Sequence, residues 1–229
     1  MSSADRARRW RHVLTELRPD LPGEWSVRGA GLDTVLVREP LDWALAWIGY
    51  SGSPTRPVGW VAAGVQPLVT PFTSWIMTYG VRMDEVRTGP STVDLSSAGA
   101  VEQARRFALD AGLEKIDGWP AERLADVAER DFAQDPRRRR THWHQLPGWR
   151  VVNGTGSPVE PATQLVELCR ERAAGTSGTG ARQLAEQAAF HDGLVRAWQN
   201  GERDAALEFL TAQRDQALAA RKLDRALTA

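Results

Sequence analysis

Hydrophobic residues recur with a helical period at the start of the chain. Within residues 3–18 the apolar side chains stand at positions i, i+3, i+4 and i+7, and most of the arginines lie off that stripe. The stripe consists of Trp10, Val13, Leu14 and Leu17. Ser2 or Ser3 can cap such a helix, and Pro19 can end it. The pattern predicts an amphipathic N-terminal helix.

From Trp25 to about Leu95 the hydrophobic period changes to two, which is typical of β-strands. Proline and glycine separate four alternating runs, and a short fifth strand is expected after them. The four runs are Asp33–Arg38, Asp42–Tyr50, Val58–Gln66 and Ser74–Met83, and the fifth strand lies around Thr92–Leu95. Because the connections are too short for crossover helices, the strands are expected to pair as antiparallel neighbours.

The two faces of this predicted sheet differ in side-chain size. Trp43, Leu45 and Trp47 share one face of the second run, whereas Ala44 and Ala46 lie on the other. The third run contributes either Gly59 and Ala63 or Ala62 and Gly64 to such a small-residue face. A face of small residues lets a helix or a ligand approach closely, so we expect helices on both faces, with a binding groove as the alternative.

After Leu95 the pattern becomes mainly helical. Three helices are expected before residue 175: one that Ser96 or Ser97 caps and Gly112 ends, and two at Ala121–Phe132 and Ala162–Ala174. The stretch between the last two is rich in proline and glycine, with a short strand predicted at Trp149–Val152.

The end of the chain predicts a helical hairpin after a flexible connector at Gly175–Gly180. Its helices are Ala181–Gln199 and Glu202–Leu227, with the turn at Asn200–Gly201. The stretch Asn200–Leu210 resembles the middle of a tetratricopeptide-type helix pair, and no second copy is visible.

The fold class expected from these patterns is α+β. We predict an N-terminal helix, an antiparallel sheet of four to five strands, and a helical C-terminal half that ends in a helical hairpin. The expected domains are an α+β sheet domain at 1–118, a helical and irregular segment packed on it at 119–174, and the hairpin at 181–229.

Composition narrows the class of protein and its location. The 29 basic and 29 acidic residues cancel, so general attraction to nucleic acid or membranes is not expected. Cys169 is the only cysteine, and neither an 18-residue apolar run nor a secretory signal is present, which predicts a cytoplasmic protein without a membrane partner. Only two of the basic residues are lysines, a bias typical of GC-rich bacteria such as actinobacteria, or of their phages.

Ten tryptophans are the clearest departure from average composition. Tryptophan is enriched at the energetic centres of protein interfaces, and a core of this size holds only part of the ten. Trp119, Trp143 and Trp149 stand in proline- and glycine-rich surroundings and are therefore expected at the surface. We interpret them as candidate partner-binding residues.

Two clusters beside these tryptophans support alternative functions. Four consecutive arginines, Arg137, Arg138, Arg139 and Arg140, could grip phosphates while Trp143 stacks on a base, which would indicate nucleic-acid binding. His142 and His144 alternate by two, so on an extended segment both imidazoles would face one side and could bind a metal, with His191 or an aspartate as a third ligand.

Complete catalytic or cofactor motifs are missing from the sequence. There is no Gly-x-Ser-x-Gly elbow, and the glycine-rich stretches lack the lysine and hydroxyl of a nucleotide-binding loop. We therefore expect no cofactor, and favour a non-catalytic bacterial or phage protein-binding module, such as an adaptor, an immunity protein or an assembly component. Nucleic-acid binding is the alternative, and a metal-dependent hydrolase is less favoured.

Overall fold

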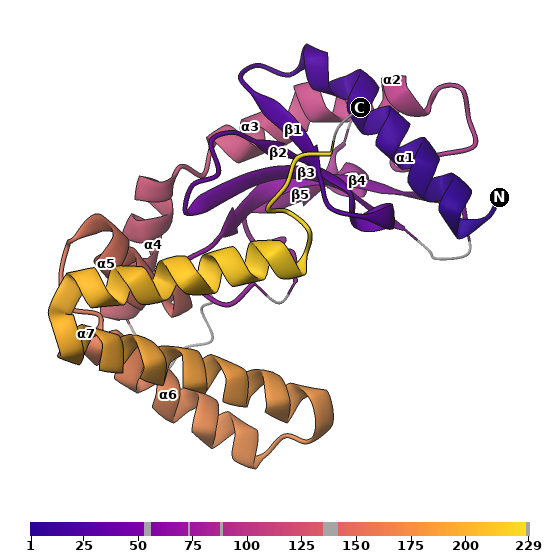
Figure 1. The fold of residues 1–229 in the computed structure, drawn as a ribbon. Helices are drawn as coiled ribbons and strands as arrows, with labels where there is room; N and C mark the ends of the chain where they lie inside the picture. Colours follow the sequence, from indigo (N-terminus) through magenta and orange to yellow (C-terminus); the bar gives the residue numbers. More distant parts are fainter. Residues whose placement is uncertain (53–55, 73, 88, 135–141, 228–229) are drawn as a thin grey trace. The chain divides into compact units, whose positions relative to one another are not determined.

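The computed structural model describes residues 1–52, 56–72, 74–87, 89–134 and 142–227 (Figure 1). These residues group into two compact units. The first consists of Met1–Gln66, Ser74–Pro120 and Leu218–Ala229, and the second of Pro67–Thr73 and Ala121–Ala217. The division at 1–118, 119–174 and 181–229 that composition suggests stays a prediction.

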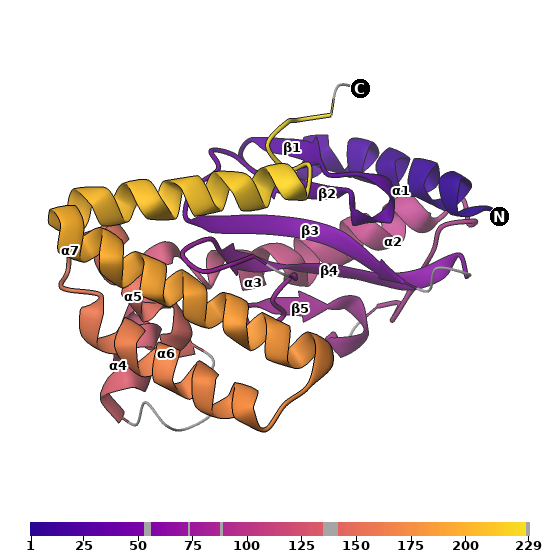
Figure 2. The ribbon, with the colours of Figure 1, turned by 60° about the horizontal axis from the view of Figure 1, so that its bottom comes forward.

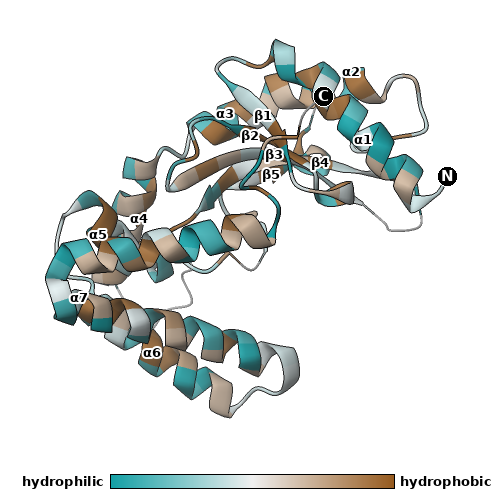
Figure 3. Ribbon diagram, in the orientation of Figure 1, coloured by the Kyte–Doolittle hydropathy of each residue, from teal (hydrophilic) through white to brown (hydrophobic). Residues whose placement is uncertain are grey.

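The predicted N-terminal helix is confirmed as α1 (Ser3–Leu17). Ser2 caps it, because its side chain accepts a hydrogen bond from the Asp5 backbone while the Asp5 carboxylate accepts one in return. The apolar stripe is buried, and Figure 3 shows the alternation of hydrophobic and hydrophilic residues along the helix. Trp10 anchors the stripe, since its indole N–H donates to the Thr34 carbonyl oxygen at 2.7 Å.

Six strands of the described residues form one antiparallel sheet, which confirms the α+β class. The sheet order is β1-β2-β3-β4-β5, and β6 pairs with β4. The strands are β1 (Trp25–Arg28), β2 (Val35–Arg38), β3 (Ala44–Gly52), β4 (Val58–Pro67), β5 (Gly80–Arg82) and β6 (Val93–Asp94). Within it Leu36 lies opposite Ile48, and Ala63 lies opposite Val81.

The predicted strand Ser74–Met83 is wrong over its first half, since only Gly80–Arg82 pairs as a strand. The buried amide of Gln66 accepts a hydrogen bond from the Ile76 backbone, which holds this part of the chain away from the ladder. Trp75 then packs on Trp47 with ring centroids 4.5 Å apart. The strand begins at Gly80, where a Cβ would lie 2.9 Å from the Ala63 carbonyl oxygen.

The small-residue face of the sheet carries helices, as expected. Figure 2 shows α2 (Ala100–Phe107) and α3 (Leu113–Asp117) running along one side of the strands. The prediction that Gly112 ends a helix is wrong, because it lies in the π-helical turn Ala108–Gly112 that joins α2 to α3. A Cβ at Gly112 would lie 3.0 Å from the Ala63 Cβ, so the glycine lets the helix backbone approach the sheet.

Helices make up most of the second unit. They are α4 (Ala121–Gln134), the 3₁₀ turn η5 (His142–Gln145), α5 (Leu146–Asn153), α6 (Val159–Ala174) and most of α7 (Gly178–Ala220). The predicted strand Trp149–Val152 is wrong, because α5 covers it with Pro147 in its first turn and the left-handed Gly154 (φ 65°) at its end. The expected connector is shorter than predicted, since α7 begins at Gly178.

The predicted turn of the helical hairpin is confirmed within α7. The helical backbone breaks at Gly201 and Glu202, the latter with a left-handed φ of 49°. Phe190 and Phe209 from the two arms lie with ring centroids 5.5 Å apart, so the arms fold back on each other. Among the described residues, none of the helices combines the length and the apolar composition that crossing a bilayer requires.

Candidate functional site

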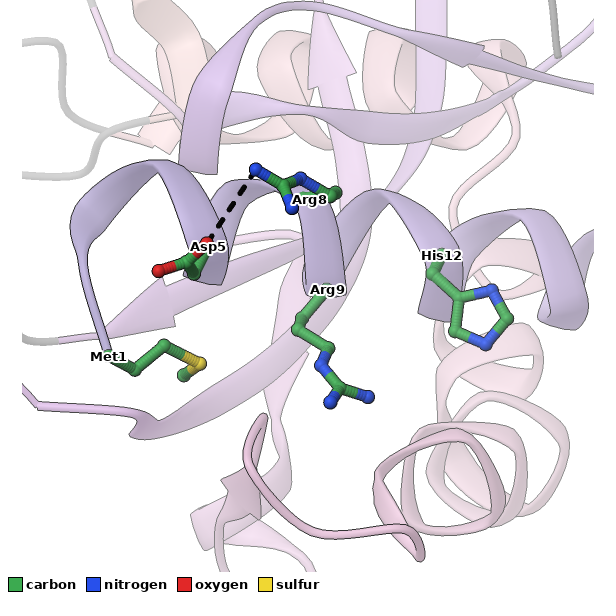
Figure 4. A pocket seen from close by; sticks show the side chains of 5 residues that line it. All are labelled: Met1, Asp5, Arg8, Arg9 and His12. Atoms are coloured by element: carbon green, nitrogen blue, oxygen red, sulfur yellow. Dashed lines mark ion pairs between the residues drawn. The ribbon is translucent and has the colours of Figure 1, made fainter.

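The outward face of α1 carries an open pocket of about 450 Å³ (Figure 4). Because the apolar stripe of α1 is buried, the helix turns Arg8, Arg9 and His12 outward. The pocket is lined by Met1, Asp5, Arg8, Arg9 and His12. In Figure 4 the side chains of Arg9 and His12 leave the same side of the helix, whereas Arg8 turns toward Asp5.

Positive charge is only partly neutralised in this pocket. Hydrogen bonds from Ser2 lower the pKa of the Asp5 carboxyl, which is therefore ionised at neutral pH. Its Oδ1 lies 3.6 Å from Nη2 of Arg8, which makes a loose ion pair. Arg9 forms no ion pair with any described residue, so its guanidinium is available to an external carboxylate or phosphate.

Met1 adds an apolar wall to the pocket. Its side chain is 50% exposed, and it belongs with Val58 and Leu109 to the few large hydrophobic residues that the described surface exposes. A guanidinium beside an apolar wall suits an anionic ligand that also carries an apolar group. Nδ1 of His12 lies 3.9 Å from Oε1 of Glu16, so a carboxylate lies beside the His12 end of the pocket.

The expected exposure of Trp143 and Trp149 is wrong. Their side chains are 0% and 1% exposed, and Trp143 packs on Phe132 with ring centroids 5.7 Å apart. The proline and glycine that suggested a surface loop belong to the start of α5, which buries Trp149, while Trp143 is buried in the preceding turn η5. Trp119 is half-buried in the first unit and meets Tyr79 edge-on at 4.8 Å. Two of the three candidate partner-binding indoles are therefore buried within the second unit.

The two other predicted clusters are the run of four arginines and the pair of His142 and His144. Residues 137–140, which hold the four arginines, lie outside the described residues. His142 and His144 occupy the 3₁₀ turn η5 rather than an extended segment, so their rings diverge. His142 Nδ1 lies 2.8 Å from Oδ2 of Asp131. In the described part of the chain, no three His, Cys, Asp or Glu side chains come close enough together to hold a metal ion.

His144 instead lies, half-buried, near the fully buried His191 of α7. Burial lowers the pKa of His191 to about 3, and the nearby His144 adds to the effect. Burial also lowers the pKa of His144 to about 4, with a further contribution from the Arg172 cation. Both imidazoles are thus neutral at pH 7, and Nδ1 of His191 has no hydrogen-bond partner among the described residues.

The single thiol is protected in the same unit. Cys169 is 5% exposed, and burial raises the pKa of its thiol. Its Sγ lies 3.7 Å from Oε1 of Gln187. A protonated, buried thiol is a poor nucleophile.

Sequence reasoning recognised the arginines of α1 as lying off the apolar stripe but did not identify a pocket there. The signal in the sequence was the spacing of Arg9 and His12. They stand three positions apart and therefore share one face of a helix.

Comparison with protein families, with curated proteins and with solved structures finds no match to this chain.

Proposed function

We propose that the protein is a non-catalytic protein-binding module whose contact face is the α1 pocket. The observation that carries this proposal is the juxtaposition of the exposed Met1 side chain with the Arg9 guanidinium, which pairs with no acid among the described residues. The ligand of this chemistry is an acidic segment of a partner protein that bears an apolar side chain next to its carboxylates.

Rigid support of the pocket favours this role. Trp10, Leu14 and Leu17 are 0% exposed, and the capping box at Ser2 fixes the first turn of α1. A helix held in this way presents its side chains without paying much ordering entropy on binding. Exposed ion pairs contribute only up to about 1 kcal/mol each, so we expect modest affinity that rests on several contacts.

The interior position of the most perturbed groups also supports binding rather than catalysis. The neutral His144 and His191 and the protonated Cys169 lie in the second unit, buried or nearly so. The accessible pocket offers guanidinium groups and an imidazole, which recognise anions, beside a carboxylate that is already hydrogen-bonded.

Reversing the charge of Arg9 is expected to weaken binding of an acidic peptide at least tenfold, or about 1.4 kcal/mol. The probe is a fluorescein-labelled peptide of alternating glutamate and leucine pairs, titrated by fluorescence anisotropy at low salt. The variant Arg9→Glu places a carboxylate where the ligand's carboxylate would lie. Arg11→Glu is the matched control, because Arg11 is exposed on the same helix and does not line the pocket.

Three outcomes would contradict the proposal. Equal weakening by Arg9→Glu and Arg11→Glu would show a general charge effect without a pocket. Unchanged binding after leucine is replaced by serine in the peptide would remove the apolar contact. Tight binding of a thymidine oligonucleotide, without binding of the peptide, would favour the nucleic-acid alternative instead.

A further inference from the structure

Residues 222–227 return to the first unit and lie along the outer edge of β1. The Leu227 N–H donates to the Val27 carbonyl at 2.7 Å, and the Gly29 N–H donates to the Lys222 carbonyl at 3.0 Å. Ala226 forms an antiparallel bridge with Arg28. Figure 1 shows this segment, which follows α7, passing beside β1.

β1 is the terminal strand of the sheet order, so its outer backbone groups need a partner other than a neighbouring strand. The inner groups pair with β2 over four residues, from Trp25 opposite Arg38 to Arg28 opposite Val35. The segment 222–227 supplies partners for outward groups of Val27 and Gly29. The edge therefore accepts an extended chain in the manner of an added strand.

Arg28 gives this edge a second recognition element. Its Nη2 lies 2.6 Å from Oε1 of Glu39, and its Nε donates to Oγ of Ser26 at 2.8 Å. These contacts belong to the sheet and its adjoining loop, and they hold the guanidinium in place. Its Nη1 is then directed at the carbonyl of Leu223, 2.6 Å away. The Leu223 side chain is 1% exposed and anchors the segment.

The attachment of the segment is slight by comparison with β2. It makes one isolated bridge rather than a ladder. Lys222 leaves α7 with a left-handed φ of 57°, a conformation that residues other than glycine rarely adopt. Asp224 and Arg225 are exposed and form an ion pair with each other at 3.5 Å, and with no other residue in the described part of the chain.

We propose that the outer edge of β1 is a docking site for an extended peptide of a partner protein, and that residues 222–227 occupy it as an intramolecular competitor. The peptide carries a leucine in place of Leu223, with its carbonyl oxygen on the Arg28 guanidinium. It pairs with the backbone of Val27 and Gly29. This surface is separate from the α1 pocket and does not depend on the function proposed for that pocket.

In the test, an added peptide has to compete with residues 222–227 for the edge of β1. A tethered segment acts at an effective concentration on the order of millimolar, so a micromolar peptide cannot displace it from the wild-type chain. The full chain with Leu223→Asp releases the segment by removing its anchor. The probe is a labelled peptide with the sequence of residues 221–227, Arg-Lys-Leu-Asp-Arg-Ala-Leu. We expect it to bind L223D at least tenfold more tightly than it binds the wild type.

Two controls make the binding result specific. A peptide with aspartate in place of its first leucine is expected not to bind L223D. The variant Arg225→Gln alters a side chain that is 89% exposed, and it is expected to behave as the wild type. Binding of the peptide to the wild type and to L223D with equal affinity would overturn the proposal.

Hydrogen exchange supplies an independent readout. In L223D the Gly29 amide is expected to exchange faster while the amides of β2 stay protected, and added peptide is expected to restore the protection. Leu227→Pro repeats the test without touching the anchor, because proline lacks the N–H that bonds Val27. Three results would overturn the proposal. The first is unchanged exchange of the Gly29 amide in both variants, and the second is protection of this amide that returns without peptide binding. The third is loss of the folded sheet in both variants.

Discussion

Lowering the pH from 7 to 5 is expected to reduce the free energy of unfolding by about 4 kcal/mol, through the half-buried His144 and the buried His191. Both imidazoles are neutral in the folded protein, because burial lowers the pKa of His191 to about 3 and that of His144 to about 4. In the unfolded chain each titrates near its ordinary pKa of 6.5. As the pH falls below 6.5, the two histidines therefore bind protons in the unfolded state but stay neutral in the folded state.

The sign follows from this difference in bound protons. Stability is fully present above pH 6.5 and is lost as the pH falls toward the lowered values of the folded state. At pH 5 each histidine costs about 2 kcal/mol, since one pH unit below 6.5 is worth about 1.4 kcal/mol per group. Urea denaturation at pH 7, 6 and 5, followed by tryptophan emission, measures the loss.

Substitution assigns the effect to the pair. His191→Leu is expected to remove about half of the pH dependence, because it fills the same space and leaves no titratable group. The exposed His12→Gln is the control, and it is expected to keep the full dependence. A His191→Leu variant that loses stability with pH as steeply as the wild type would contradict the assignment.

Placing a side chain on Gly148 is expected to destabilise the second unit by about 3 kcal/mol, at the upper end of overpacking costs. A Cβ at this position would lie 2.4 Å from the Val69 carbonyl oxygen and 2.6 Å from the Val69 Cβ. Both residues belong to the second unit, so the clash is internal to it. The backbone oxygen cannot rotate away, and one of the two segments has to move.

Thermal unfolding of Gly148→Val checks this expectation. A loss of this size lowers the Tm by roughly 10 °C in a chain of this length. Gly99→Ala is the matched control, because the nearest atom to its new Cβ is the Ser97 Oγ at 3.5 Å, an ordinary contact. A Gly148→Val protein that unfolds at the wild-type temperature would mean that α5 does not pack on Val69 as described.

Local hydrophobic patterns predicted the elements that bury one regular face. The stripe around Trp10 predicted α1, and the alternation in β3 and β4 predicted two strands within two residues of their observed ends. These patterns work because one face of each element is buried, so the period appears directly in the sequence. The turn at Gly201 was visible for a similar reason, since glycine interrupts two helical periods.

Tertiary contacts decided the rest. β1 is four residues long and shows too few alternations to be recognised, yet β2 pairs along all of it. Trp149 and Val151 alternate like a strand, but Gly148 lets this segment pack closely on Val69 as a helix. The hydrogen bond between Gln66 and Ile76 joins residues ten positions apart, which no local period reports.

The candidate site was predictable only in part. The charge of the α1 arginines is plain in the sequence, but their burial differs: Arg6 is 2% exposed, whereas Arg8 and Arg9 are exposed. That difference follows from the position of Arg6 one turn before Trp10, on the inward side. The predicted exposure of Trp149 was wrong because the proline and glycine beside it begin a helix. This helix packs closely on Val69, and the segment does not form a loop.

The return of residues 222–227 to β1 has a consequence for synthesis of the chain. The ribosome produces the first strand long before the residues that cover its edge, with the whole second unit made in between. At 5–20 residues per second, the roughly 190 residues between β1 and this segment leave that edge bare for roughly 10–40 s. During this interval the nascent sheet offers an unpaired strand to other nascent chains, so chaperone binding during translation would protect this protein most at its beginning.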